Sequence, residues 1–278
     1  MTFTQWHDAA WASPLCVGID PHPEQIAQWG LPDSPDSLST FSNNVLSAAA
    51  GRARFIKPQS AFFERHGSAG IAVLEDLLAQ AREAGLLSIL DAKRGDIGST
   101  MAGYADAYLN PARPLAADAL TVSPYLGVGS LRPAMEAAAE HSKGLFVLAL
   151  TSNPEGREVQ HARTPEGRAV AAEVVRQAEE VNRQLDVPLI GLVVGATIGT
   201  AAADLGIDLG GFSGPVLSPG FGSQGAGTAD LEAVFGDAYR AGRVIVNASR
   251  SLSRCGPDSA DIAEEIASIA EAVTPKGR

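Results

Sequence analysis

The residue types that acid–base chemistry needs are concentrated in the segment 90–97, which reads LDAKRGDI. It follows the apolar run 86–90, and a short continuous run of this kind is typical of a buried strand. Asp91 and Lys93 are two residues apart, so an extended chain places both side chains on one face, with Asp96 in the turn beyond. Such a set forms either a structural salt bridge, because buried charges are normally paired, or the acid and base of a reaction.

Further charged and polar residues stand at or just after the ends of other apolar runs. They are Asp20, Lys57, Ser152, Gln224 and Arg250. Burying many charges is costly unless they pair, and alternating acids and bases keep each lysine protonated. If Asp20 and Lys57 converge with Asp91, Lys93 and Asp96, we expect an array that holds a carboxylate at close range and delivers a proton.

Eight β-type runs alternate with helical patterns along the chain. We expect strands at 15–20, 54–58, 86–93, 119–123, 145–151, 189–194, 215–218 and 244–249. We expect helices at 37–50, 69–84, 100–108, 130–141, 166–185, 197–205, 229–241 and 258–273, and long loops at 21–36 and 153–163. Near-continuous apolar strands indicate a parallel sheet covered by helices. We therefore predict an α/β fold, a TIM (β/α)8 barrel that forms a single domain over residues 1–278, with its chemistry at the carboxyl ends of the strands.

The loop after the seventh expected strand reads SPGFGSQG and contains a G-x-G-x-x-G pattern at 220–225. A dinucleotide site would need this pattern in a βαβ unit with an acidic residue ending the next strand. The next strand instead ends in Asn247-Ala248-Ser249-Arg250. We therefore interpret the loop as a phosphate site, in which glycines let backbone N–H groups approach the anion and Arg250 supplies a bidentate guanidinium. Gln224 adds an amide donor.

The composition excludes several classes of protein. A net charge of −11 and a pI near 4.9 argue against a nucleic-acid or anionic-membrane surface, both of which need basic patches. The two cysteines, Cys16 and Cys255, are far apart and indicate neither a disulfide framework nor a zinc site. No apolar run approaches 18 residues and the N-terminus has no signal-peptide pattern, so we expect a cytoplasmic protein.

Taken together, the motifs resemble those of the orotidine 5′-phosphate decarboxylases. The D-x-K-x-x-D-[IV] signature of that family matches DAKRGDI at 91–97, and further matches are GIDP at 18–21, FIKPQ at 55–59 and SPGFGSQG at 218–225. Arg250 follows the eighth strand as the family pattern requires. The sequence FIKPQSAFFE and the chain length resemble those of the longer bacterial subgroup, type 2. The D-x-K-x-x-D motif alone is shared with related sugar-phosphate decarboxylases and synthases, whereas the combination is highly specific.

The resemblance implies a homodimer of barrels that converts orotidine 5′-monophosphate to UMP and carbon dioxide, the last step of de novo pyrimidine synthesis, with no cofactor and no metal. By position, Lys93 would protonate C6 as carbon dioxide leaves, and Asp91 would lie against the substrate carboxylate. Asp96 would complete the catalytic array by reaching into the partner subunit's site, with Ile97 and Thr100 beside it.

The resemblance also assigns residues to the rest of the nucleotide. Asp20 and Lys57 would hold the ribose hydroxyls, with Lys57 also a member of the catalytic array. Gln224 and Arg250 would bind the phosphate, and Ser152 would contact the pyrimidine.

Two alternatives stay open at this point. A metal-using relative acting on another sugar phosphate would require magnesium, whereas a decarboxylase of the resembling family would survive EDTA. A catalytically silent nucleotide-binding barrel would bind UMP without turnover, although a pure binder has no need of a proton donor among its charges.

Overall fold

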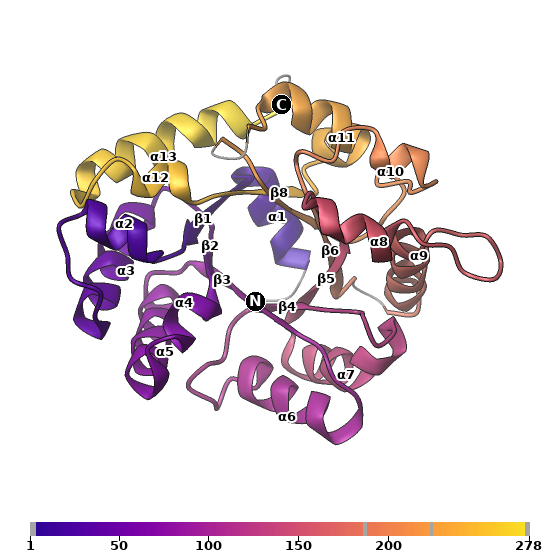
Figure 1. Ribbon diagram of the computed structural model, residues 1–278, viewed down its shortest axis with the longest axis horizontal. Coiled ribbons are helices and arrows are strands. Elements are labelled where there is room, and N and C mark those ends of the chain that lie inside the picture. Colours follow the sequence, from indigo (N-terminus) through magenta and orange to yellow (C-terminus); the bar gives the residue numbers. More distant parts are fainter. Residues whose placement is uncertain (1–3, 186–187, 223–224, 276–278) are drawn as a thin grey trace.

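A computed structural model describes residues 4–185, 188–222 and 225–275, and in it eight parallel strands close into a barrel in sequence order (Figure 1). The strands are β1 (Leu15–Ile19), β2 (Phe55–Pro58), β3 (Leu87–Arg94), β4 (Ala119–Val122), β5 (Gly144–Leu150), β6 (Ile190–Val194), β7 (Val216–Pro219) and β8 (Val244–Ala248). Every strand boundary lies within one residue of the prediction, which confirms the (β/α)8 barrel. Within the described ranges, no helix is long and apolar enough to cross a membrane.

The helices surround the strands on the outside of the barrel, with one exception treated below. They are α1 (Thr4–Ala12), α2 (Pro23–Gln28), α3 (Pro35–Ala49), α4 (Ser60–Glu64), α5 (Gly67–Glu83), α6 (Gly98–Leu109), α7 (Arg132–His141), α8 (Arg157–Gln160), α9 (Val170–Arg183), α10 (Ala201–Asp204), α11 (Thr228–Arg240), α12 (Arg250–Ser253) and α13 (Ser259–Val273). Two single turns of 3₁₀ helix, Val128–Leu131 and Pro154–Gly156, precede α7 and α8.

Some helix predictions were wrong. The helix expected at 166–185 begins only at Val170, because Arg163 and Ala169 pair as an antiparallel bridge that closes a turn. The helix expected at 197–205 shrinks to α10. The segments 21–36 and 153–163, expected as loops, contain the short helices α2 and α8 and the start of α3. In α2, the His22 ring accepts a hydrogen bond from the Glu24 backbone N–H and caps the helix.

Helix α1, which the sequence pattern did not predict, covers the end of the barrel where the strands begin. Figure 1 shows it inside the ring of strands in projection rather than outside that ring. Its Trp6 ring lies 5.2 Å from the ring of Phe55 and 5.9 Å from that of Phe146, near the first residues of β2 and β5. All three rings are buried, and each fully buried large apolar side chain contributes about 1.5–3 kcal/mol. This end of the barrel is therefore filled, and the opposite mouth is left for function.

Candidate active site

Three neighbouring strands bring acidic and basic side chains together at the mouth. Asp20 follows β1 directly, Lys57 lies in β2 and Asp91 lies in β3. The Lys57 Nζ atom is 2.9 Å from Asp91 Oδ2 and 3.8 Å from Asp20 Oδ1. Lys57 is 4% exposed and Asp91 is 8% exposed, so these charges are desolvated and depend on one another. The predicted convergence of these three residues is thus present in the fold.

Lys93 joins the array through Asp91, with Nζ 2.5 Å from Asp91 Oδ1. Its side chain is 44% exposed, which leaves the ammonium facing the open mouth. The expected route to this contact was wrong, because the backbone at Lys93 is not extended: its φ is +46°, in the left-handed region. Leu90 pairs with Leu120 and Arg94 pairs with Val122, so β3 advances four residues while β4 advances only two. This bulge, rather than plain alternation, turns Lys93 back onto Asp91.

The electrostatics of the array keep Asp91 and Lys57 charged. Burial alone would raise the pKa of the Asp91 carboxyl, but the positive charges of Lys57 and Lys93 and their hydrogen bonds outweigh burial and hold it well below its usual value. Burial alone would lower the pKa of Lys57, but the negative charges of Asp20 and Asp91 outweigh burial and raise it. The mouth therefore presents fixed charges at neutral pH.

Two hydroxyl groups that the sequence analysis missed complete the array. Thr121 Oγ1 donates to Asp91 Oδ1 at 2.9 Å and accepts the backbone N–H of Lys93 at 2.9 Å. Ser249 Oγ donates to Asp20 Oδ2 at 2.5 Å. Thr121 lies in β4, where a threonine is typical of any strand. The signal that could have identified it is its position in the strand expected at 119–123, which neighbours the strand expected at 86–93 in a barrel.

Two connected hollows open beside the array. One, of about 180 Å³, is lined by residues that include Asp20, Lys57, Asp91 and Asn247. The other, of about 210 Å³, is lined by Asp20, His22, Glu24, Gln25, Phe62 and Arg250. Arg250 and Asp20 line both, so the two hollows form one path from the charged array to the guanidinium. Within the described residues, Arg250 makes no ion pair, which leaves it available to an anion.

The glycine-rich loop after β7 lies on this path. Gly220, with φ +109°, lines the 180 Å³ hollow, and Gly222, with φ +70°, follows; both conformations favour glycine. The N–H of Gly222 donates to Ala226 O and that of Gly225 to Gly222 O, so these two donors serve the loop itself. Gln224, predicted to bind the phosphate, lies outside the described residues.

The other predicted residues sit at the rim of the mouth. The Asp96 carboxylate accepts the backbone N–H of Ile97 at 2.8 Å and makes no ion pair with a described residue, so it does not join Lys93 within one chain. Ile97 is 62% exposed, and Thr100 and Ser152 are also exposed. Ser152 follows β5 beside Gly195, which follows β6. The chain therefore gathers four of the five charges that we expected to converge.

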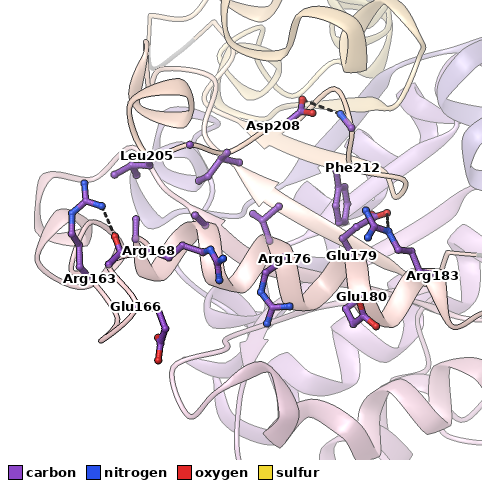
Figure 2. Close-up of a pocket in the computed structure, with 17 residues that line it drawn as sticks. Arg163, Glu166, Arg168, Arg176, Glu179, Glu180, Arg183, Leu205, Asp208 and Phe212 are labelled. Atoms are coloured by element: carbon purple, nitrogen blue, oxygen red, sulfur yellow. Dashed lines mark hydrogen bonds and ion pairs between the residues drawn. The ribbon is translucent and has the colours of Figure 1, made fainter.

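A wider hollow of about 850 Å³ lies away from the mouth, between α9 and the segment 205–212 (Figure 2). Three of the four arginines that line it have acidic partners: Arg183 pairs with Glu179, and both Arg168 and Arg176 pair with Glu173. The fourth, Arg163, donates to the Gly167 carbonyl. Over the described part of the chain, no group of three or more His, Cys, Asp or Glu side chains could hold a metal ion. The buried charge array belongs to the mouth, where Arg250 lies beside it, and we take the mouth as the functional site.

The fold and this site define a (β/α)8 barrel of the kind found in enzymes, with lysine and aspartate side chains gathered at its carboxyl-end mouth beside an arginine. The family model described as orotidine 5′-phosphate decarboxylase / HUMPS family matches residues 13–266. The chain belongs to this family.

Similar proteins cover most of the chain. It is 55% identical over 249 residues to the orotidine 5′-phosphate decarboxylase of Salinispora arenicola, covering 89% of this chain and 87% of that protein. It is also 55% identical over 248 residues to that of Streptomyces coelicolor, covering 88% and 86%. A crystal structure of a Streptomyces avermitilis protein assigned as an orotidine 5′-phosphate decarboxylase matches with a TM-score of 0.91 and 51% identity, over 98% of this chain and 94% of that one.

Proposed function

We propose that this chain decarboxylates orotidine 5′-monophosphate to UMP and carbon dioxide, the last step of de novo pyrimidine synthesis. One observation carries the proposal: the continuous chain of contacts Asp20–Lys57–Asp91–Lys93, whose first three members line one hollow together with Arg250. Among the described residues, Arg250 has no acidic partner. A nucleotide that lies along these hollows has its reacting end at the array and its phosphate at the arginine.

In this proposal, Lys93 supplies the proton. The bond between C6 and the carboxylate carbon breaks, carbon dioxide leaves, and the electron pair stays on C6. The Lys93 ammonium stabilises this developing charge and transfers a proton to C6, after which the neutral amine regains a proton from solvent. The exposure of Lys93 supports both steps, because the ammonium faces the mouth while Asp91 anchors it from below.

Asp91 holds the Lys93 ammonium in place through their contact, and Lys57 holds Asp91 ionised. Asp20 and Lys57 also offer a carboxylate and an ammonium to the ribose hydroxyls. Ser152 would contact the pyrimidine, and Gln224 would join Arg250 at the phosphate. Phosphate binding far from C6 would raise the rate as well as the affinity, since it orients the reacting end.

We further propose that the active unit is a homodimer. Large apolar side chains are exposed in the loops after the neighbouring strands β3 and β4: Ile97 is 62% exposed, Tyr125 is 78% and Leu126 is 53%. The two loops meet where Gly95 lies against Ser123. Exposed apolar groups gathered in this way are typical of an interaction surface. Because Asp96 makes no ion pair with the described residues of its own chain, its carboxylate can enter a partner's site, with Thr100 beside it.

The test is an ultraviolet assay of orotidine 5′-monophosphate depletion, with UMP identified as the product, using chain treated with EDTA and then freed of it. We expect full turnover after this treatment. A strict requirement for added magnesium would instead favour a metal-using relative acting on another sugar phosphate. UMP binding without turnover would favour a nucleotide-binding barrel.

A further inference from the structure

The backbone at Lys93 adopts a conformation that a lysine does not choose by itself. Its φ of +46° lies in the left-handed region, where a side chain with a Cβ is strained. Residues in such conformations persist only where their surroundings determine them, and they concentrate at functional sites. The groups that hold Lys93 in place are therefore candidates for control of the reaction.

The Thr121 hydroxyl is one of these groups, and it uses both of its hydrogen-bonding capacities on the array. It accepts the N–H of Lys93, the residue with the unusual φ, and it donates to Asp91 Oδ1, the same oxygen that lies 2.5 Å from the Lys93 ammonium. Thr121 is 1% exposed, so solvent is not present to replace these bonds. A single hydroxyl thus ties the lysine backbone to the carboxylate that anchors the lysine side chain.

Arg94 secures the other side of the bulge. Its carbonyl accepts the N–H of Ser123 at 2.8 Å, which restores the β3–β4 pairing immediately after Lys93. Its guanidinium lies over the rings of Tyr104 and Tyr108, at 5.5 and 5.6 Å from their centroids, and pairs with Glu64. With Arg94 fixed from outside the barrel and Thr121 fixed from inside, the turn at Lys93 has little freedom.

We propose that Thr121 is a positioning residue for the decarboxylation: its hydroxyl sets the direction of the Lys93 ammonium through both the Lys93 backbone and Asp91. The inference rests on the proposed function. It predicts that loss of this hydroxyl lowers kcat and leaves nucleotide binding intact, because Thr121 does not line the hollows that lead to Arg250.

The experiment replaces Thr121 by Val, which keeps the shape and removes the hydroxyl, and by Ser, which keeps the hydroxyl. We expect Thr121→Val to lower kcat by about 100-fold, the effect of a displacement near 1 Å at a reacting group. The KM and the Kd for UMP should not change, and Thr121→Ser should retain most of the wild-type kcat. Thr121→Ala, which adds no bulk, provides the same comparison if the valine variant does not fold.

The chain offers a matched control between β3, which contains Ser88, and Asp118, the residue directly before β4. Ser88 Oγ donates to Asp118 Oδ2 at 3.1 Å and accepts the Asp118 N–H at 3.1 Å, an equivalent bridge at the closed end of the barrel. Ser88→Ala should reduce stability without changing kcat. A Thr121→Val or Thr121→Ala enzyme whose kcat falls no further than that of Ser88→Ala, or a Thr121→Ser enzyme as slow as the hydroxyl-free variants, overturns the inference. Wild-type chain that does not consume orotidine 5′-monophosphate would refute the proposed function instead.

Discussion

Replacing Asp91 by Asn tests whether the charges at the mouth depend on one another as the geometry indicates. The substitution keeps the side-chain shape but leaves the buried Lys57, among the described residues, with Asp20 at 3.8 Å as its one anionic partner. It also replaces one carboxylate oxygen by an amide NH2 group, which must face either Lys57 or the pair Lys93 and Thr121, and these groups are themselves donors. Both effects destabilise the folded state at neutral pH.

The magnitude follows from the burial of the pair. The Lys57 and Asp91 side chains are only 5% and 11% exposed, and removing one partner of a buried pair costs about 3–5 kcal/mol. At roughly 2 °C per kcal/mol for a chain of this length, the melting temperature should fall by about 6–10 °C. Urea unfolding at pH 7, followed by circular dichroism, measures the free energy directly.

The pH dependence of folding stability independently checks the direction of this effect. The pKa of Asp91 is lower in the folded protein than its ordinary 3.8, so its stabilisation is present in full above pH 3.8 and is lost as the pH falls through the folded pKa. For Lys57, whose pKa is raised above 10.5, stabilisation is complete below that value and is lost as the pH rises through the folded pKa. The difference in stability between wild type and Asp91→Asn should therefore be widest at intermediate pH and narrow under acid.

A control substitution separates buried from exposed pairs. Glu136 lies 2.8 Å from Arg132 on the outer helix α7, where the side chains are 63% and 79% exposed, so Glu136→Gln should leave stability almost unchanged. Two results would show that the mouth charges do not depend on one another. One is an Asp91→Asn chain as stable as Glu136→Gln, and the other is a stability difference from wild type that does not shrink below pH 3.8.

Two further predictions concern the phosphate and the dimer. Arg250→Ala should raise KM about 10- to 100-fold through loss of a charged hydrogen bond, as steady-state kinetics would measure, and an unchanged KM removes Arg250 from the phosphate site. Lys93→Ala and Asp96→Ala chains, each inactive alone, should regain activity when unfolded and refolded together, because a hybrid dimer contains one site with both residues intact. A mixture that stays inactive while sedimentation shows hybrid dimers would contradict the shared site.

The strands could be predicted from sequence because each is a short apolar run, and burial on both faces leaves a signal that tertiary structure does not override. Helices α1, α2 and α4 could not, since each has fewer than ten residues and depends on packing: Trp6 of α1 is held by rings from β2 and β5. The predicted helix start at 166 missed the turn that Arg163 and Ala169 close.

At the site, sequence reasoning found Asp20, Lys57, Asp91 and Lys93 because strand ends converge in a barrel. It could not foresee the left-handed φ at Lys93, since bulges depend on pairing with a neighbouring strand rather than on local pattern. For the same reason it missed Thr121, whose role exists only across the β3–β4 interface.

The most direct test of the central claim, that fixed charges at the barrel mouth deliver the proton, is the release of carbon dioxide by Lys93→Ala. Release from carboxyl-labelled orotidine 5′-monophosphate is compared with wild type at saturating substrate, with UMP affinity measured in parallel. We predict that UMP still binds and that release falls by at least about 10⁴-fold, the combined loss of a proton donor and of charge stabilisation. Release near the wild-type rate from a folded Lys93→Ala chain would contradict the mechanism.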